Sequence, residues 1–188
     1  MNRLLKSPLE PHRFRGYKAE LVAAFTSGAL RVLEVGCGLR HYEAYCMGKQ
    51  YVCVDIGLRP DVLASASSLP FVDGCFDRVI MFDVLEHVVD IKNAIWECRR
   101  VLADNGLLLI LTPNTLGLGF YDSFADPSHL HHFSWRGLTK LLHSCGLNVI
   151  AQIPLPLHIY WPLRLIRNRK LRFIQQSICV VAVRDDEP

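Results

Sequence analysis

The sequence predicts an α/β domain with a doubly wound, mostly parallel sheet of seven strands, the last of them antiparallel. Short apolar runs alternate with segments of helical periodicity, and such runs are typical of parallel strands that are buried on both faces. In addition, the apolar residues 32–35 run directly into the turn Gly36-Cys37-Gly38. A parallel strand that breaks into a glycine turn is typical of a ligand-binding α/β sheet.

The elements follow one another in a regular order. Strands are expected over residues 32–35, 52–55, 62–63, 76–82, 107–111, 147–153 and 177–183. Helices are expected over residues 15–25, 39–47, 91–102 and 135–144, and residues 115–133 are expected to form a long loop. Asp90 and Ser134 are predicted helix caps, because a short polar side chain can accept the free amides of a first turn. Asn105-Gly106 and Gly146 are the predicted stops of the last two helices.

Length and composition indicate one domain over residues 1–188. Hydrophobic residues make up 51% of the chain and charged residues 21%, which is a globular composition. No apolar run approaches the ~20 residues that cross a bilayer, and the N-terminus lacks the apolar segment of a signal peptide. The seven cysteines have no paired spacing. They therefore indicate a reduced, cytoplasmic protein.

Charge is distributed unevenly along the chain. Between Pro127 and Arg184 there are eight basic residues and no acidic one, which favours an anionic partner unless this is only a solvated face. Residues 157–173 mix aromatic and aliphatic residues with arginines, so they could form an amphipathic helix on an anionic membrane, or pack as an insertion. Nucleic acid is disfavoured as a partner, because no separate RNA-binding region is recognisable.

A nucleoside site is predicted where the first two strands end. Asp55 closes the second strand, and an acid at this position accepts hydrogen bonds from ribose hydroxyls, while the glycines let the backbone approach the ligand. His41 stands where the dinucleotide motif has its third glycine. A pyrophosphate is therefore disfavoured and a nucleoside without phosphates is favoured.

Four segments together resemble a known family. They are residues 32–38, Val54-Asp55, residues 68–71 with Phe76-Asp77, and residues 83–88. In this order and spacing the chain resembles the class I S-adenosylmethionine-dependent methyltransferases, in particular the group called methyltransferase type 11, over about residues 30–150 and the final strand. The resemblance implies a Rossmann-like fold and S-adenosylmethionine as the cofactor.

The resemblance also implies roles for individual residues. Gly36, Cys37 and Gly38 would contact the amino-acid end of the cofactor, with Glu34 supporting the turn. Asp55 would hold the ribose and Ile56 would lie against the adenine. Ser65 stands where many relatives have an Asp that accepts the adenine amino group, and Ala66 would offer its backbone N–H to the ring. Phe82 and Asp83 would border the methionine part, and Arg13 or Arg15 could bind its carboxylate.

The acceptor side is expected to carry the proton chemistry. A hydroxyl acceptor usually loses its proton to a base, and the candidate catalytic residues are His87, His129 and His132, each of which could instead be structural. Asp126 with His129 and His131 could bind a metal, but no second carboxylate is obvious and no metal site is predicted.

The predicted function is methyl transfer to a small-molecule acceptor or to a lipid- or sugar-linked one, which could be anionic, with oxygen favoured over nitrogen or carbon as the acceptor atom. RNA methylation and a catalytically silent S-adenosylmethionine-binding subunit are the alternatives. Residues 1–29 would form a helical cover on the N-terminal side. Residues 115–133 and 154–173 would cover the acceptor.

Overall fold

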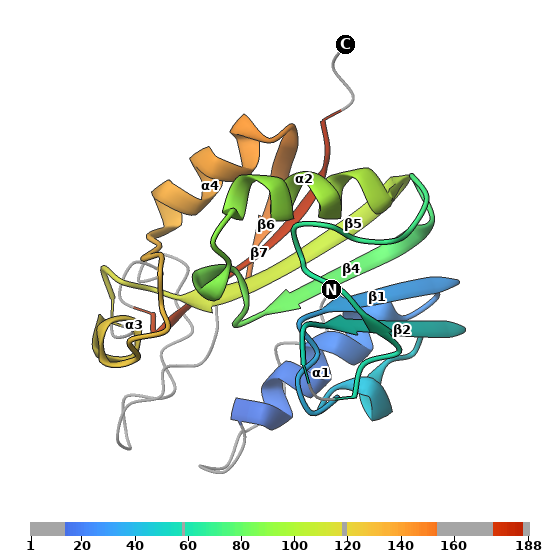
Figure 1. The fold of residues 1–188 in the computed structure, drawn as a ribbon, viewed down its shortest axis with the longest axis horizontal. Helices are drawn as coiled ribbons and strands as arrows, with labels where there is room; N and C mark the ends of the chain where they lie inside the picture. Colours follow the sequence, from blue (N-terminus) through green and yellow to red (C-terminus); the bar gives the residue numbers. More distant parts are fainter. Residues whose placement is uncertain (1–13, 58, 118–119, 154–174, 186–188) are drawn as a thin grey trace.

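The computed structural model describes residues 14–57, 59–117, 120–153 and 175–185, and its centre is a seven-stranded sheet (Figure 1). The strands are β1 (Arg31–Val35), β2 (Gln50–Asp55), β3 (Val62–Leu63), β4 (Phe76–Phe82), β5 (Leu102–Pro113), β6 (Leu147–Gln152) and β7 (Ser177–Arg184). Their order is β3-β2-β1-β4-β5-β7-β6, and only β7 runs antiparallel to its two neighbours. The predicted fold class is confirmed.

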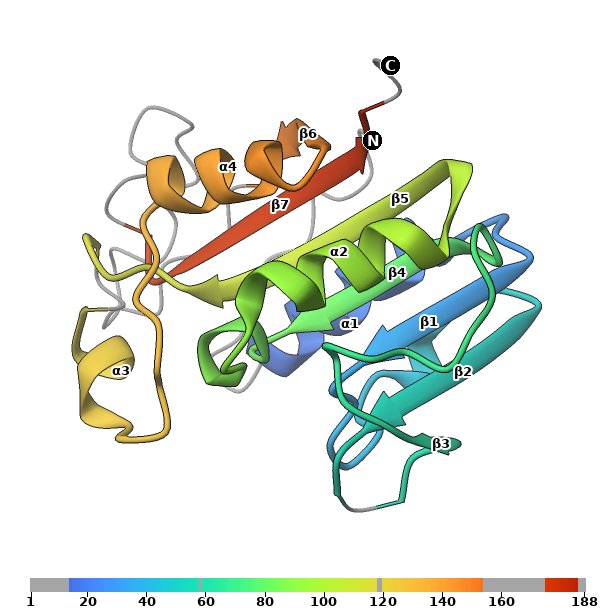
Figure 2. The ribbon, with the colours of Figure 1, turned by 45° about the horizontal axis from the view of Figure 1, so that its top comes forward.

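Helices cover both faces of this sheet (Figure 2). Helix α1 (Phe14–Thr26) packs on one face, and α2 (Ile91–Val101) and α4 (Trp135–Ser144) pack on the other. Successive strand residues point to opposite faces, so Val32 belongs to the cluster under α1 and Leu33 to the cluster under α2 and α4. This double burial explains why the strands are nearly continuous apolar runs.

Both predicted caps are confirmed. The Asp90 carboxylate accepts the N–H of Asn93 at 3.1 Å where α2 begins. The Ser134 hydroxyl accepts the N–H of Gly137 at 3.1 Å where α4 begins. Gly146, which follows α4, has a φ of +72°, a conformation that glycine adopts without strain.

Three local predictions were wrong. Instead of a helix over residues 39–47, only a 3-10 helix, Glu43–Tyr45, follows the glycine turn, because Arg40 has a φ of 58° and cannot propagate a right-handed helix. Strand β5 begins at Leu102, where it pairs with Phe76 across a register shift, so Asn105-Gly106 lies inside the strand and does not end a helix. The expected loop 115–133 contains a short helix, α3 (Phe120–Ala125).

Some expectations concern residues beyond the described ranges. The segment 154–173, with its expected membrane contact and acceptor cover, lies outside them, as does Arg13. No helix in the part of the chain that the structure describes is long and apolar enough to cross a membrane. All seven cysteines are free thiols.

Candidate functional site

The predicted site residues meet at the edge of the sheet formed by the carboxyl ends of its parallel strands. Val35 of β1 lies opposite Val54 of β2 on one side and Met81 of β4 on the other. The residues that follow these strands therefore share one edge. Ligands of open α/β sheets bind at this edge, outside the strand ends.

The two glycines of the turn face different surroundings. Gly36 has a φ of +74°, and a Cβ there would lie 2.2 Å from a Val84 methyl carbon. Gly38 has a φ of +50°, and a Cβ there would meet no described atom within 4 Å. The Gly36 N–H donates to the Val54 carbonyl at 2.7 Å. Gly36 therefore allows close packing, while Gly38 borders open space at the edge of the sheet.

Asp55 is held in place by the backbone on both sides. Its Oδ2 accepts the N–H of Gly38 at 2.8 Å, and its Oδ1 accepts the N–H of Gly57 at 2.9 Å. A carboxylate oxygen has two lone pairs, so each oxygen keeps one acceptor position. The fixed carboxylate can thus receive two neighbouring hydroxyls. Cys37, next to this contact, is buried, and burial raises the pKa of its thiol.

The side predicted to hold the adenine is formed by residues after β2 and β3. Ile56 is 80% exposed and offers an apolar surface beside Asp55. Leu63 of β3 pairs with Asp55, which carries Ser65 and Ala66 to the same edge. The exposed Ser65 accepts the N–H of Ser67 at 3.2 Å, and Ala66 is buried.

Glu34 lies inside the sheet. It is 2% exposed, and its Oε2 accepts the hydroxyl of Tyr51. Burial raises the pKa of its carboxyl to about 7, although the Tyr51 hydrogen bond opposes that shift. A side chain with so little exposed surface acts on the turn through packing.

The end of β4 carries an ion pair. Asp83 has a φ of 52° and donates its N–H to the Leu111 carbonyl at 2.8 Å. Its half-exposed carboxylate accepts Lys18 from α1, and the ammonium is almost completely buried. Phe82 is buried and packs edge-on against Tyr42 with ring centroids 5.4 Å apart. Helix α1 is thereby connected to the predicted methionine end of the site; the side chain of Arg15 is outside the described residues.

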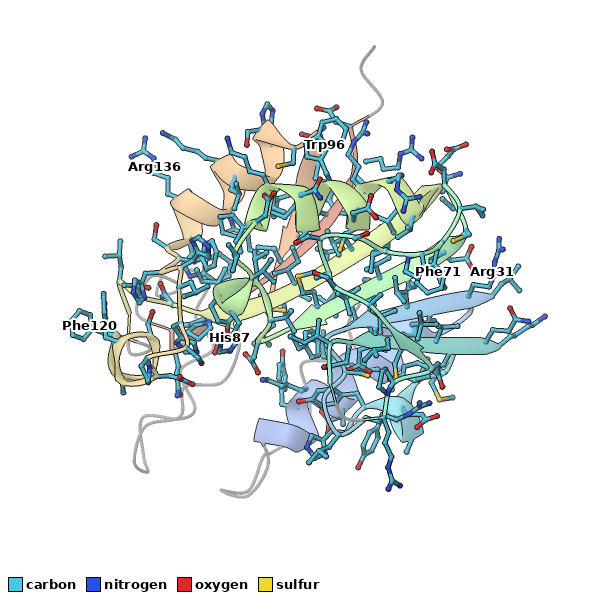
Figure 3. All side chains as sticks on the ribbon, in the orientation of Figure 1. Arg31, Phe71, His87, Trp96, Phe120 and Arg136 are labelled. Atoms are coloured by element: carbon cyan, nitrogen blue, oxygen red, sulfur yellow. The ribbon has the colours of Figure 1, made fainter. Side chains whose placement is uncertain are left out.

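Two of the three candidate catalytic histidines come together. The 3-10 helix η2 (Leu85–His87) follows Asp83, and its Glu86 carbonyl accepts the N–H groups of Leu130 and His131 at 2.8 and 3.1 Å. These contacts bring the ring of His129 to 4.7 Å from that of His87. Figure 3 shows His87 beside α3, far from Arg31 and Phe71 at the opposite edge of the sheet.

His132 does not join this pair. Its Nδ1 contacts the hydroxyl of Ser123 at 2.9 Å, and its ring stacks on Phe124 with centroids 4.1 Å apart. His131 has a buried Nε2 with no hydrogen-bond partner among the described residues. From the sequence, Asp126, His129 and His131 could be metal ligands, although no metal site is predicted. In the described residues, the donor atoms that lie together belong to Glu86, His87 and His129.

Sequence reasoning missed Glu86 and Lys18 as site residues. Glu86 is 1% exposed, and burial followed by the nearby Asp83 charge raises the pKa of its carboxyl to about 7. The sequence feature that could have identified Glu86 is its position as a carboxylate within the mostly apolar residues 84–89. Lys18 is 4% exposed. Its signal is a lysine on the apolar side of α1, between Tyr17 and Leu21.

Comparison with known proteins points to one family. The family model of the methyltransferase domain matches residues 9–152. A probable S-adenosylmethionine-dependent methyltransferase of Mycobacterium tuberculosis is 32% identical over an alignment of 139 residues that covers 64% of this chain and 49% of that protein. The mitochondrial ubiquinone biosynthesis O-methyltransferase of Bos taurus is 33% identical over 101 residues, 46% of this chain and 27% of that protein. The chain spans about half the length of the mycobacterial relative that it matches.

Solved structures share the fold. A SAM-dependent methyltransferase from Archaeoglobus fulgidus superposes with a TM-score of 0.72 at 17% identity, covering 93% of this chain and 95% of that one. A possible histamine N-methyltransferase from Thermotoga maritima superposes with a TM-score of 0.70 at 18% identity, covering 93% and 91%. At these identities the likeness concerns the fold alone.

Proposed function

This chain belongs to the methyltransferase domain family, the class I S-adenosylmethionine-dependent methyltransferases, and we propose that it transfers a methyl group from S-adenosylmethionine to an oxygen of a small-molecule acceptor. The observation that carries this proposal is the fixed Asp55 carboxylate beside the open turn at Gly38. A nucleoside with two neighbouring ribose hydroxyls fits this arrangement.

The surroundings of Asp55 support the same cofactor. Asp55 would hold the ribose, the exposed Ile56 would pack against the adenine, and Gly38 leaves room for the amino-acid end. Ser65 can accept a hydrogen bond from the adenine amino group as a hydroxyl, which is weaker than a carboxylate. Asp83, whose carboxylate is half-exposed, lies at the end of β4 where the methionine ammonium would sit.

The protein's main task in this reaction is alignment. S-adenosylmethionine supplies a methyl group that is already activated on a sulfonium. Holding an acceptor in line with the breaking S–C bond can account for about 7–11 kcal/mol of barrier lowering. The carboxyl edge between Asp83 and His87, which follow β4, is where such an acceptor would be held.

Oxygen is proposed as the acceptor atom because of the histidine pair. The Nδ1 atoms of His87 and His129 lie 3.1 and 3.0 Å from the carbonyl oxygens of Ser128 and Ser123. A ring nitrogen facing a carbonyl carries the proton, so each Nε2 is left as the acceptor. A base of this kind contributes ~10²–10⁴-fold to a rate. The bovine relative is named an O-methyltransferase, which supports the same atom.

An anionic or lipid-linked acceptor is favoured by two features of the chain, one in its sequence and one at its described surface. The eight basic residues between Pro127 and Arg184 favour an anion. Leu116, Phe120 and Leu130 are 76, 61 and 52% exposed and would contact an apolar group. The bovine relative is named for ubiquinone biosynthesis, which is consistent with an acceptor of this kind.

The cofactor site is tested by titrating S-adenosylhomocysteine into the protein by calorimetry, with Asp55→Asn as the variant. We expect micromolar binding that weakens by at least tenfold in the variant. Asp77→Asn is the matched control, because Asp77 also accepts two backbone N–H groups, those of Leu30 and Arg31, at the opposite edge of the sheet. Equal losses in both variants, or no binding by the folded protein, would overturn the proposal.

The acceptor is tested by screening phosphorylated, glycosylated and prenylated phenols with labelled S-adenosylmethionine. Methylation of a phenolic oxygen is the expected result. Binding of the cofactor without turnover on any acceptor would instead indicate a catalytically silent partner subunit. Methylation of RNA in preference to the phenols would overturn the proposed acceptor class.

A further inference from the structure

The carboxyl edge of the sheet gathers three donor side chains from two distant segments. One donor atom each from Glu86, His87 and His129 lies within 4.8 Å of the other two. From this cluster we infer that the protein binds one divalent transition-metal ion, such as Zn²⁺, through these three side chains. Donors of a tetrahedral zinc site lie about 3.3–3.5 Å apart, given bonds of about 2.0–2.2 Å, so the site closes with small side-chain movements.

The carboxyl group of Glu86 belongs to this cluster, and one of its oxygens has no hydrogen-bond partner among the described residues. Glu86 is 1% exposed, and its Oε2 accepts the Thr112 hydroxyl at 3.0 Å. Its Oε1 is buried and has no hydrogen-bond partner within the described ranges. Buried carboxylate oxygens are normally paired, because an unsatisfied one carries its whole desolvation cost. A cation bound at Oε1 would satisfy it.

Both histidines have the orientation of metal ligands. His129 is fixed through Nδ1 by the Ser123 carbonyl at 3.0 Å, and His87 through Nδ1 by the Ser128 carbonyl at 3.1 Å. Metal-binding histidines usually donate one ring N–H to a carbonyl or carboxylate, which sets the tautomer and leaves the other nitrogen as the ligand. With Nδ1 donating to a carbonyl, the nitrogen left for the ion is Nε2 of each ring.

Asp126 places a second carboxylate beside the cluster. Its Oδ2 lies 3.8 Å from Nε2 of His129, while its Oδ1 is held by the N–H and the hydroxyl of Ser128 at 2.9 and 2.6 Å. A carboxylate facing a nitrogen lone pair is repelled unless a positive charge lies between them. That charge is either a proton on His129 or a metal ion, and the unsatisfied Oε1 of Glu86 favours the ion. Imidazole with carboxylate ligands favours zinc and similar ions over calcium or magnesium.

Three protein ligands leave a coordination position open, as in catalytic metal sites. On the proposed function, an acceptor hydroxyl would occupy that position, and the ion would replace the histidine pair as the group that favours loss of the hydroxyl proton, because both Nε2 atoms are then bound to the ion. Its proton would leave to solvent, its oxygen would form the bond to the methyl carbon, and the electron pair of the broken S–C bond would remain on sulfur. This role depends on the proposed function, whereas the metal site itself does not.

The site is tested with tag-free protein that has been stripped by a chelator and titrated with ZnCl₂ by calorimetry, with bound zinc counted by mass spectrometry. One equivalent is expected. Because even the loss of an outer partner weakens metal binding by about 10–100-fold, His129→Gln and His87→Gln should each weaken it by at least about 100-fold. A folded Glu86→Gln variant should weaken zinc binding to the same extent. If Glu86→Gln does not fold, His87→Gln still tests the site, because His87 is exposed and its replacement leaves the core intact.

The matched control is His143→Gln, an exposed histidine in the last turn of α4. It should bind zinc like the original protein. Substoichiometric zinc, or equal affinity in the ligand variants and the control, would overturn the inference. Titration of the same samples with S-adenosylhomocysteine separates the two proposals: cofactor binding without zinc binding removes the metal site alone, and zinc binding without cofactor binding removes the proposed function alone.

Discussion

At the scale of single residues, the two glycines of the turn predict different consequences for the same substitution. Gly36→Ala introduces a Cβ 2.2 Å from Val84 in addition to a positive φ, so we expect a loss of about 2–4 kcal/mol in the free energy of unfolding. Gly38→Ala has the φ cost alone, about 1–2 kcal/mol, but its methyl group enters the space assigned to the cofactor. It should therefore weaken S-adenosylhomocysteine binding strongly.

Urea unfolding and calorimetric titration measure the two effects separately. The control is Gly36→Ala in a Val84→Ala background, which removes both methyl carbons near the new Cβ and should recover the contact part of the loss. If Gly36→Ala costs no more than Gly38→Ala, the close approach of Val84 does not explain the glycine.

The raised pKa of the buried Glu34 carboxyl makes the stability of the protein depend on pH. Its folded pKa is about 7 against an ordinary 4.5, so the folded protein binds this proton more tightly than the unfolded chain does. Its contribution to stability is fully present below pH 4.5 and is lost as the pH rises to about 7. The full loss is about 3 kcal/mol.

The variant Glu34→Gln can still accept the Tyr51 hydroxyl but does not titrate. Urea unfolding of the ligand-free proteins at pH 5, 6 and 7.5 should show the variant gaining on the original protein as the pH rises. A difference in stability that stays constant over this range would mean that Glu34 does not carry the pH dependence.

At the scale of elements, the ion pair between Lys18 of α1 and Asp83 after β4 predicts an asymmetry. The Lys18 side chain is 5% exposed and that of Asp83 is 45% exposed. Asp83→Asn removes this carboxylate from a buried ammonium, and because Asp83 is half-exposed we expect a loss smaller than the ~3–5 kcal/mol typical of fully buried pairs. Lys18→Met leaves a carboxylate that water can reach and fills the space with an apolar chain. We therefore expect Lys18→Met to be clearly less destabilising.

Chemical unfolding of the two single variants and the double variant measures this asymmetry. The double variant Lys18→Met/Asp83→Asn should be more stable than Asp83→Asn alone, because the buried ammonium that lost this carboxylate is no longer present. Equal losses in the two single variants would show that the ammonium of Lys18 is better solvated than its burial indicates.

At the scale of the whole molecule, the sequence predicts most of the sheet and the caps because these depend on local patterns. The limits of β4 and the caps Asp90 and Ser134 agree with prediction. The start of β5 was not predictable, because Leu102 joins the strand by pairing with Phe76 across a register shift. Likewise Arg40, which ends the expected helix, is held by Glu43 and by Asp61, which lies 21 positions away.

The candidate site also has one part that the sequence predicts and another that only the fold reveals. Gly36 and Asp55 were predictable as neighbours, since the carboxyl ends of adjacent parallel strands share one edge. The meeting of His87 and His129 was not, because it depends on the backbone contacts of Glu86 with residues that lie more than forty positions further along the chain. Residues that are brought together by contacts between distant segments show no local periodicity in the sequence. Their proximity becomes visible only in the fold.

The two faces of the sheet are predicted to unfold together, which also tests the expectation of a single domain. Leu21 of α1 and Leu138 of α4 are fully buried on opposite faces, and β7 contributes Val181 to the first cluster and Val180 to the second. Leu21→Ala and Leu138→Ala should each lower the free energy of unfolding by about 2–5 kcal/mol. Their effects should add in the double variant, because the two sites share no partner.

Urea unfolding followed by both tryptophan fluorescence and far-ultraviolet circular dichroism makes the test. In a background with Trp96→Phe and Trp161→Phe, Trp135 at the start of α4 is the remaining tryptophan and reports on one face, whereas dichroism reports on all elements. Leu116→Ala is the control, because Leu116 is 76% exposed and should shift the midpoint little. Coincident curves in every variant indicate one cooperative unit, since every central strand is shared by both clusters. If Leu21→Ala instead shifts an early dichroism transition while fluorescence is unchanged, the face under α1 unfolds by itself and the chain is not one cooperative domain.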